Sequence, residues 1–340
     1  MATVLVTGGA GYVGCILVPQ LLEAGYAVTV YDLMLFGSEG LPSHPDLRVI
    51  EGDIRDLAAF RSALDGAQAV IHLACISNDP SFELDPALSK SINYDCFEPL
   101  VAACKASGVR RFIYASTSSV YGVSDAPEVT EDHPLLPLTD YNKYKGLCEP
   151  ILLRYQSPEL TTVILRPATV CGYSPRMRLD LTVNILTHLA VTQRQVTVFG
   201  GSQQRPNIHI QDLAELYVKL LEFPDAQVAG ETFNAGYQNH TVAELAEMVR
   251  RVVEDEMPQL APIRITTSPS NDLRSYHVCS KKIAQRLGYV PTRTIEEAIR
   301  QLCQAFRAGK LPNSLSDERY VNVKTVKRLT AKLLRQPVAA

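Results

Sequence analysis

The sequence predicts an α/β protein built on a doubly wound parallel sheet, with a smaller α/β lobe towards the C-terminus. Two observations support this fold class. Through the first half of the 340-residue chain, short apolar runs of strand length alternate with segments whose apolar residues recur at helical spacing. The first apolar run, 4–6, leads into a glycine-rich turn and then into a helix. Ligands are therefore expected beyond the carboxyl ends of the strands.

The glycine-rich turn reads TGGAGYVG over residues 7–14. One glycine allows a tight turn with positive φ, a second lets the backbone approach a diphosphate, and a third lets strand and helix pack closely. The helix that follows offers unpaired N–H groups and a partial positive charge to phosphates. A glycine turn without a ligand is the alternative. The turn predicts a Rossmann-like dinucleotide site that includes Gly8, Gly11, Tyr12 and Val13.

Asp32 completes this pattern at the end of the second apolar run, 27–31. Its spacing from the glycine turn is that of an acid that binds the adenosine ribose. A carboxylate there accepts hydrogen bonds from the ribose hydroxyls and repels a 2′-phosphate. The predicted cofactor is therefore NAD rather than NADP.

The rest of the sheet follows in order. Strands are expected at 47–50, 69–74, 111–115 and 162–166, and helices at 57–64, at 93–107 and from Tyr141 onwards. The carboxyl ends of parallel strands meet at one edge of a sheet. One crevice should thus be lined by Asp53, Ala74, the Ser/Thr run after Ala115, and Pro167.

Beyond residue 170 the alternation loosens. Residues 1–170 are expected to form the NAD-binding domain, to which 207–236 return. Residues 171–206 and 237–340 are expected to form a substrate-binding lobe with a C-terminal helical tail. The tail carries basic residues that are typical of a solvated helix face, with a phosphate or membrane surface as the alternative: Lys324, Lys327, Arg328, Lys332 and Arg335.

Composition excludes several classes of function. The apolar fraction of 46% is ample for a core, and a net charge of −3 gives no basic field for nucleic acid. No apolar run is long enough to span a membrane, and the first strand leaves no room for a secretory signal. The eight cysteines form no CxxC pair, which favours reduced thiols in a cytoplasmic protein. The histidines have no metal-ligand spacing, and His72 and His209 are interpreted as core residues.

Tyr141 and Lys145 are four residues apart, so both side chains lie on one face of the predicted helix. A nearby ammonium, together with a positively charged nicotinamide ring, would lower the pKa of the phenol and make it a usable base. The Ser/Thr run 116–119 precedes this helix by one element and offers a hydroxyl to the same substrate oxygen. Two exposed helical residues without a role are the alternative.

These motifs identify a resemblance that covers almost the whole chain. The sequence resembles the extended short-chain dehydrogenase/reductases, and within them the NAD-dependent nucleotide-sugar epimerases and dehydratases. The resemblance rests on TGGAGYVG, Asp32, Gly52-Asp53-Ile54, His72-Leu73-Ala74, STSSVYG from Ser116, YNKYK from Tyr141, Leu165-Arg166-Pro167, and the run from Asn207 to Asp212.

The resemblance implies roles for individual residues. Tyr141 would be the catalytic base and would also contact the cofactor. Lys145 would hold the nicotinamide ribose, and Thr117 matches the catalytic Ser/Thr position, where it would contact the substrate. The remaining cofactor contacts that it implies are Asp53 and Ile54 at the adenine, Leu73 and Ala74 along the ribose and phosphates, Asn93 in support, and Pro167 by the nicotinamide.

The substrate implied is a nucleotide-diphosphate sugar. Arg205 and Arg274 match cations that contact its diphosphate, and Arg176 and Arg178 are further candidates. Ser77, in a loop after a strand, and Thr169 are candidates for the sugar, although a loop cap explains Ser77 equally well. The resemblance also implies a homodimer through the helices at 93–107 and 141–153.

The reaction implied is oxidation at C4 of the sugar, most simply as part of 4-epimerisation. Dehydratases of the family carry Asp-Glu after the catalytic Thr, where this chain has Ser118-Ser119, which disfavours 4,6-dehydration. The segment 166–180 resembles a subgroup that includes GDP-heptose 4-dehydrogenases, so release of a ketone is an alternative. A non-catalytic NAD-binding regulator is the alternative from another class, and the intact Thr117, Tyr141 and Lys145 argue against it.

Overall fold

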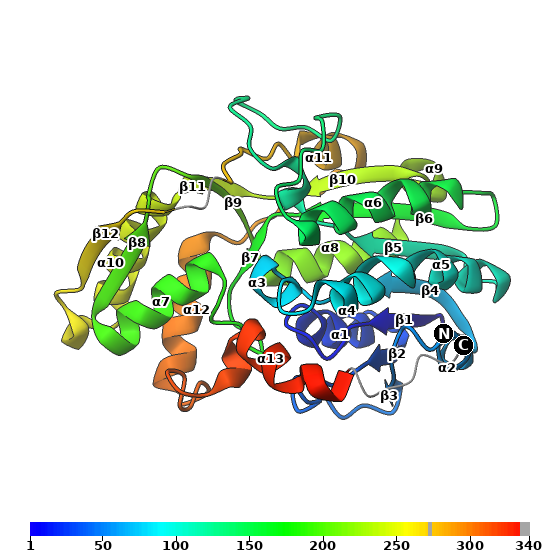
Figure 1. The fold of residues 1–340 in the computed structure, drawn as a ribbon, viewed down its shortest axis with the longest axis horizontal. Coiled ribbons are helices and arrows are strands. Elements are labelled where there is room, and N and C mark those ends of the chain that lie inside the picture. The colour runs from blue at the N-terminus through cyan, green and yellow to red at the C-terminus, as the bar shows by residue number, and fades with distance from the viewer. Residues whose placement is uncertain (271–273, 334–340) are drawn as a thin grey trace.

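The computed structural model describes residues 1–270 and 274–333, with side chains described up to residue 328. Its centre is a sheet of seven parallel strands in the order β10-β6-β5-β4-β1-β2-β3 (Figure 1). The strands are β1 (Thr3–Thr7), β2 (Ala27–Asp32), β3 (Leu47–Glu51), β4 (Ala67–His72), β5 (Arg111–Ala115), β6 (Thr161–Pro167) and β10 (Glu231–Ala235). The predicted doubly wound parallel sheet is confirmed.

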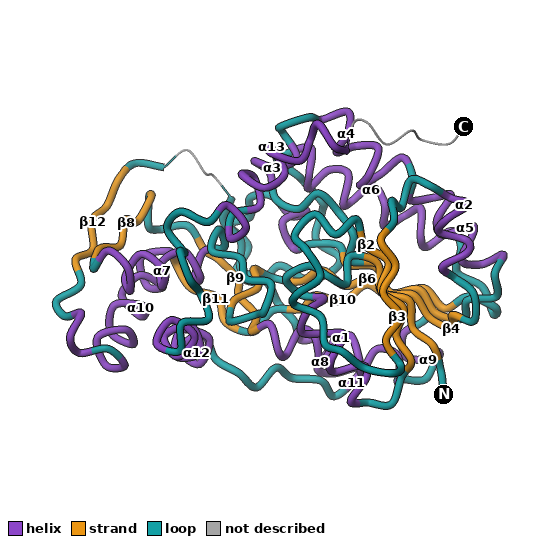
Figure 2. Tube along the Cα trace, turned by 90° about the horizontal axis from the view of Figure 1, so that it is seen from below, coloured by secondary structure: helices purple, strands orange, loops and turns teal. Residues whose placement is uncertain are grey.

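Helices cover both faces of this sheet (Figure 2). One face carries α1 (Gly14–Glu23), α8 (Ile210–Glu222) and α11 (Lys281–Leu287), whose apolar residues form one core with the strands. The other face carries α2 (Leu57–Ala63), α5 (Phe97–Ala106) and α6 (Asp140–Arg154), which form a second core. The strands β1, β2, β4, β5 and β6 therefore contribute buried side chains to both cores, whereas β10 contributes only to the first.

The smaller lobe has its own core. The strands β7 (Thr169–Cys171), β9 (Gln204–His209) and β11 (Gln238–Thr241) form a sheet, and β8 (Gln195–Phe199) pairs with β12 (Arg264–Ser268). Around them pack α7 (Thr182–Gln193), α10 (Val242–Glu256) and α12 (Ile295–Arg307). Both α10 and α12 begin with a capping box, from Thr241 and Thr294.

The segment expected to be a single helix at 93–107 begins earlier and is interrupted. Asp85 caps a short helix α4 (Pro86–Lys90) by accepting a hydrogen bond of 2.9 Å from the Leu88 N–H, and Pro86 suits its first position. A π-helical turn, Ser91–Asp95, then joins α4 to α5. The cap and the proline set a helix start that the apolar periodicity alone did not reveal.

The remaining elements are short, apart from the last helix. They are α3 (Asp79–Phe82), α9 (Asp225–Val228) and the 3₁₀ turns Ser118–Tyr121, Pro258–Leu260 and Glu318–Tyr320. Helix α13 (Asn322–Leu333) returns from the smaller lobe and lies against α3 (Figure 1, red and cyan).

Only some of the basic side chains of the C-terminal tail lie within the part of the chain that the structure describes. Lys324, Lys327 and Arg328 are exposed on α13, as the solvated-face interpretation requires. The side chains of Lys332 and Arg335 lie outside the described residues. None of the helices in the described ranges is long and apolar enough to cross a membrane.

Candidate active site

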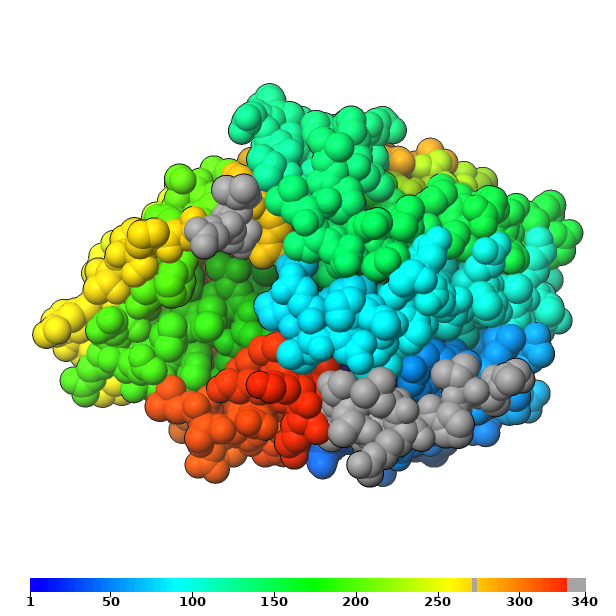
Figure 3. Space-filling model, viewed as in Figure 1, coloured from blue at the N-terminus to red at the C-terminus, as the bar shows by residue number. Residues whose placement is uncertain are grey.

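A cavity of about 540 Å³ lies beyond the carboxyl ends of the central strands. The space-filling view shows a recess on this side, bordered by α3 in cyan, the green segment of the smaller lobe and α13 in red (Figure 3). Most residues predicted for the site line the cavity: Gly8, Gly11, Tyr12, Val13, Asp32, Ile54, Leu73, Ala74, Ser77, Thr117, Tyr141, Lys145, Pro167, Thr169, Arg176, Arg178, Arg205 and Arg274.

The glycine turn packs so closely against neighbouring backbone that two of its positions admit no side chain. Gly8 has a φ of +74°, and a Cβ there would lie 2.7 Å from the backbone nitrogen of Ala74. A Cβ on Gly14, the first residue of α1, would lie 2.3 Å from the carbonyl oxygen of Gly9. Tyr12, Val13 and Gly14, at the start of α1, line the cavity. This geometry fits the diphosphate of a dinucleotide.

Asp32 is fixed at the end of β2 by backbone donors. Its Oδ2 accepts a hydrogen bond from the Ala10 N–H at 3.0 Å, and its Oδ1 accepts one from the Met34 N–H at 2.9 Å. Burial raises the pKa of this carboxyl, and the two N–H donors oppose that shift. The carboxylate has further lone pairs for ribose hydroxyls.

The side chains of three predicted cofactor residues are bound to other parts of the protein. Tyr12 lines the cavity, and its side-chain hydroxyl donates to the Gly172 carbonyl at 2.6 Å. Asp53 does not line the cavity, since its carboxylate is held by Arg55 at 2.5 Å. Asn93 is buried behind the wall, where its amide bonds both backbone groups of Ile76 at 2.8 and 2.9 Å. Asn93 therefore acts on the cavity only through the backbone it holds.

Lys145 and Thr117 are both anchored where they meet the cavity. The Lys145 ammonium is buried and donates to the Ala115 carbonyl at 2.7 Å. Thr117 caps the 3₁₀ turn after β5, because its Oγ1 accepts a hydrogen bond from the Ser119 N–H at 3.1 Å. The end of β5 thus fixes a hydroxyl and an ammonium on one wall.

Tyr141 lines the same cavity, and in the protein alone burial dominates the pKa of its phenol. Burial raises the pKa of the phenol well above its usual value of 10, and the guanidinium groups of Arg178 and Arg274 act against burial. The sequence-based prediction combined Lys145 with a bound nicotinamide ring. The protein's own groups alone do not lower the pKa of the phenol, because desolvation outweighs the nearby cations. A positively charged ligand beside the phenol would add to the effect of the two arginines.

The cations predicted for the substrate diphosphate are paired within the protein. Arg274 forms an ion pair with Asp79 at 2.6 Å, and Asp79 also accepts a hydrogen bond from the Thr139 hydroxyl. Arg205 donates to the backbone carbonyl oxygens of Gln204 and Arg274. An anionic ligand would therefore compete with Asp79 for Arg274.

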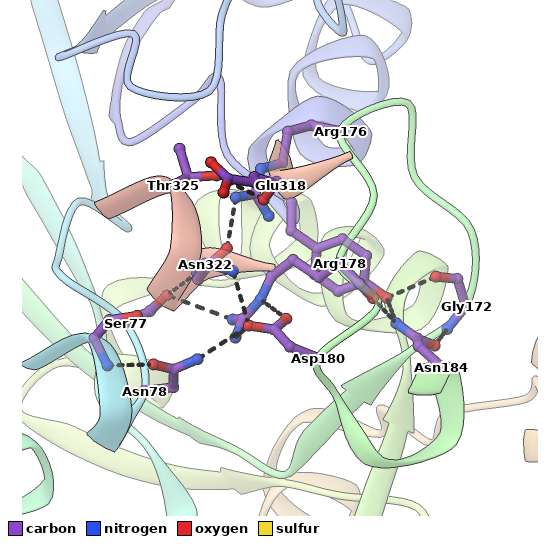
Figure 4. Close-up of polar contacts among 12 residues, drawn as sticks. Ser77, Asn78, Gly172, Arg176, Arg178, Asp180, Asn184, Glu318, Asn322 and Thr325 are labelled. Carbon is purple, nitrogen blue, oxygen red and sulfur yellow. Dashed lines mark hydrogen bonds and ion pairs between the residues drawn. The ribbon is translucent and has the colours of Figure 1, made fainter. Parts of the chain in front are cut away.

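A second polar cluster joins the smaller lobe, the loop after β4 and the start of α13 (Figure 4). Arg178 is paired with Asp180 at 2.9 Å. Asn322 donates from its side chain to the Ser77 hydroxyl at 2.7 Å and from its backbone to Asp180 at 3.1 Å. Arg176 donates to the Asn322 side-chain oxygen at 2.6 Å.

Sequence reasoning missed Asn322, Asp180 and Cys75 as cavity residues. The only signal for Asn322 was its place before the apolar positions of the last helix, which is typical of a helix start rather than of a site. Asp180 could have been suspected as the partner of Arg178 two residues earlier.

The histidines and cysteines follow the structural interpretation. His72 is buried and bonds the Thr7 hydroxyl through Nδ1 at 2.8 Å. His209 is also buried, and its two ring nitrogens contact Gln301 and the Gln211 N–H. All eight cysteines are free thiols. The described residues contain no group of three or more His, Cys, Asp or Glu side chains arranged to hold a metal ion.

Comparison with known proteins identifies relatives across most of the chain. Residues 4–236 match the family model described as the NAD dependent epimerase/dehydratase family. The UDP-glucose 4-epimerase of Corynebacterium glutamicum is 31% identical over 322 residues, covering 90% of this chain and 95% of that protein. The UDP-glucose 4-epimerase of Bacillus subtilis is 29% identical over 86% of this chain and 94% of its own length.

Solved structures with this fold include complexes with NAD and with sugar nucleotides. The UDP-glucose 4-epimerase of Thermotoga maritima, solved with UDP-glucose, superposes with a TM-score of 0.80 at 25% identity, over 90% of this chain and 99% of that one. The UDP-glucose 4-epimerase of Thermus thermophilus, solved with NAD, gives a TM-score of 0.77 at 27% identity, over 90% and 99%.

Proposed function

The chain belongs to the NAD-dependent epimerase/dehydratase family, and we propose that it is a nucleotide-sugar 4-epimerase. One observation carries the proposal. A single cavity brings the glycine turn and Asp32 together with Thr117, Tyr141 and Lys145. A cofactor site and a set of proton-transfer groups thus share one space.

The residues that would hold NAD lie along one side of the cavity. Asp32 would accept hydrogen bonds from the adenosine ribose, and the turn at Gly8 and Gly11 would take the diphosphate. Lys145 would hold the nicotinamide ribose, beside Pro167. NAD would supply the acceptor that takes a hydride from the sugar and later returns it.

The protein's own groups would handle the proton. As the C4–H bond of the sugar breaks, the phenolate of Tyr141 would take the proton of the 4-hydroxyl, and the C4–O bond would become a ketone. The Thr117 hydroxyl would donate a hydrogen bond to the same oxygen. Rotation of the ketone within the cavity, followed by return of hydride and proton, would invert C4. The raised pKa of Tyr141 means that bound ligands, with Arg178 and Arg274, must help to form the phenolate.

Arg205 and Arg274 are proposed to bind the diphosphate of the sugar nucleotide. Both line the cavity and come from elements of the smaller lobe or its connections. Binding would exchange the Asp79 carboxylate for a phosphate at Arg274. Thr169 and Ser77 are the proposed contacts to the sugar.

The two serines that follow Thr117 disfavour dehydration of the sugar. Ser118 and Ser119 lie with their hydroxyl groups 3.4 and 3.3 Å from the hydroxyl of Tyr276. Hydroxyl groups with a neutral partner cannot serve as the acid and base that loss of water from C5 and C6 requires.

A substrate panel tests the proposal. Purified protein is incubated with UDP-, GDP-, dTDP- and CDP-sugars, and the products are identified by NMR while absorbance of NADH is recorded. An epimerase yields the C4 epimer without net NADH. Accumulation of NADH with a keto sugar would instead identify a 4-dehydrogenase, and no reaction with any sugar nucleotide would overturn the proposal.

We also propose a cytoplasmic homodimer. The free state of all eight cysteines supports a reducing compartment. On α6, Leu147 and Leu153 are exposed at 40% and 38%, which supports a helix-mediated contact between two copies. Sedimentation velocity of the parent protein and of Leu147→Glu tests the dimer.

A further inference from the structure

Arg176 is a buried cation with unused donors. Its side chain is 7% exposed, and its guanidinium lies 3.6 Å from the centroid of the Phe36 ring. Its Nη2 donates to Asn322 at 2.6 Å. In the described part of the chain, its Nε and Nη1 have no hydrogen-bond acceptor.

Burying such a group without an anion is unfavourable. Burial lowers the pKa of Arg176 to about 9, and the positive charge of Arg178 acts in the same direction. Asp180 and Asp32 attract the guanidinium, but among the described residues neither is hydrogen-bonded to it. The position therefore favours an anionic ligand that brings acceptors of its own.

The surroundings of Arg176 indicate which anion. Phe36 lies four residues after Asp32, in the loop that leaves β2. A Cβ on Gly40 would lie 2.6 Å from the Cys15 sulfur and 3.3 Å from the Arg176 backbone nitrogen. Arg176 is thus packed against the ribose-binding end of the cavity and the first turn of α1. Arg176 lines the same cavity as Asp32 and the glycine turn, and its guanidinium attracts the Asp32 carboxylate.

We propose that Arg176 is a cofactor-binding residue whose guanidinium binds the diphosphate of NAD, and that Asn322 of the C-terminal helix positions it. This differs from the sequence-based expectation, which placed Arg176 at the substrate. The inference rests on the NAD dependence of the family and not on the reaction at C4.

Asn322 is suited to this positioning because each of its polar groups is engaged. Its side-chain oxygen accepts from Arg176, its side-chain nitrogen donates to Ser77, and its backbone nitrogen donates to Asp180. The residue is 3% exposed and lines the cavity. The C-terminal helix therefore supplies part of the cofactor site from the far end of the chain.

Calorimetric titration of the cofactor-free enzyme tests the proposal with three probes: NAD, ADP-ribose and UDP. Arg176→Met keeps the length of the side chain and removes its charge. This substitution should lower the affinity for NAD and for ADP-ribose by about ten- to a hundred-fold and leave the affinity for UDP unchanged. Arg176→Lys should recover part of the affinity, and Asn322→Ala should weaken NAD by about three- to tenfold.

The matched control is Arg319→Met, the same substitution at an exposed arginine of the same C-terminal segment. It should bind all three probes like the parent. If Arg176→Met lost affinity for UDP but kept its affinity for NAD, the arginine would belong to the substrate site and the proposal would be overturned. Unchanged affinity for all three probes would also overturn it. If circular dichroism shows that Arg176→Met is unfolded, Asn322→Ala decides, and parental NAD affinity in that variant refutes the proposal. No sugar nucleotide is present, so the result is independent of the proposed epimerisation.

Discussion

The cofactor side and the substrate side of the cavity are built in different ways. On the cofactor side, backbone geometry shapes the wall: Gly8 and Gly14 admit no side chain, and backbone N–H groups hold Asp32. On the substrate side, side chains form ion pairs with one another, such as Arg274 with Asp79. The first wall is ready for its ligand, whereas the second must exchange protein contacts for ligand contacts.

Tyr141→Phe should have the largest effect, because it should abolish most turnover while leaving NAD binding intact. It removes the proton-transfer group without altering the glycine turn or Asp32. Turnover is expected to fall by about a thousandfold, while NAD affinity stays within about twofold. Steady-state rates and NAD titration measure the two quantities. Substantial remaining turnover would mean that another group is the base.

Gly14→Ala tests whether the cofactor side depends on the backbone. The new Cβ would meet the Gly9 carbonyl oxygen at 2.3 Å, so the turn must shift. NAD affinity should fall by about ten- to a hundred-fold, as measured by calorimetry. The control is Gly146→Ala in α6, where the nearest atom lies at 3.5 Å and the change should raise the melting temperature slightly. Parental affinity in Gly14→Ala would contradict a backbone-built wall.

Arg274→Gln tests the substrate side. Loss of this cation should raise KM for the sugar nucleotide about tenfold, because a charged hydrogen bond to phosphate is lost. NAD affinity should stay unchanged. Arg250→Gln, at a partly exposed arginine of α10 outside the cavity lining, is the control. An equal loss of NAD affinity would mean that the two walls are not independent.

The smallest expected effect is on the free energy of unfolding as the pH falls, and it comes from two buried histidines, His72 and His209. Burial lowers the pKa of His72 to about 3, and burial also lowers the pKa of His209. Each therefore binds a proton less readily in the folded protein than in the unfolded chain, where a histidine takes up a proton below about pH 6.5. The folded state therefore binds fewer protons, and stability should fall as pH drops.

The decrease is expected to be about 1.4 kcal/mol per pH unit for His72, beginning near pH 6.5 and continuing towards its folded value. Urea unfolding at pH 7.5, 6 and 5 measures it. His72→Gln should be less stable at pH 7.5 but should show a shallower decline. His44→Gln, at an exposed histidine, should keep the parental slope. An unchanged slope in His72→Gln would show that this residue is already protonated when folded.

The same division explains what the sequence could predict. Strands, the glycine turn and Asp32 follow from patterns within about thirty residues, and the structure places them as expected. The turning of Tyr12 towards Gly172 depends on a contact 160 residues away. Asn322 meets Ser77 across 245 residues, and no local pattern encodes that distance.

Electrostatics were harder to predict than geometry. Residue spacing placed Tyr141 and Lys145 on one helix face correctly, but not the depth of burial that controls the phenol. Asp53 forms an ion pair with Arg55, two residues later in the chain, and does not line the cavity. Competition among nearby charges needs coordinates to resolve.

The chain crosses between its two lobes repeatedly: from β6 into β7, from β9 into α8, from β10 into β11, and through α11 and α12 to α13. The smaller lobe is therefore not a continuous segment of the chain that could be exchanged as one piece. Exchanging this lobe with that of a relative would require a junction at each place where the chain passes between the lobes. A chimera with a single junction would separate Asn322 from its partners. Redesign of this enzyme is better pursued by substitutions within the cavity than by exchange of whole modules.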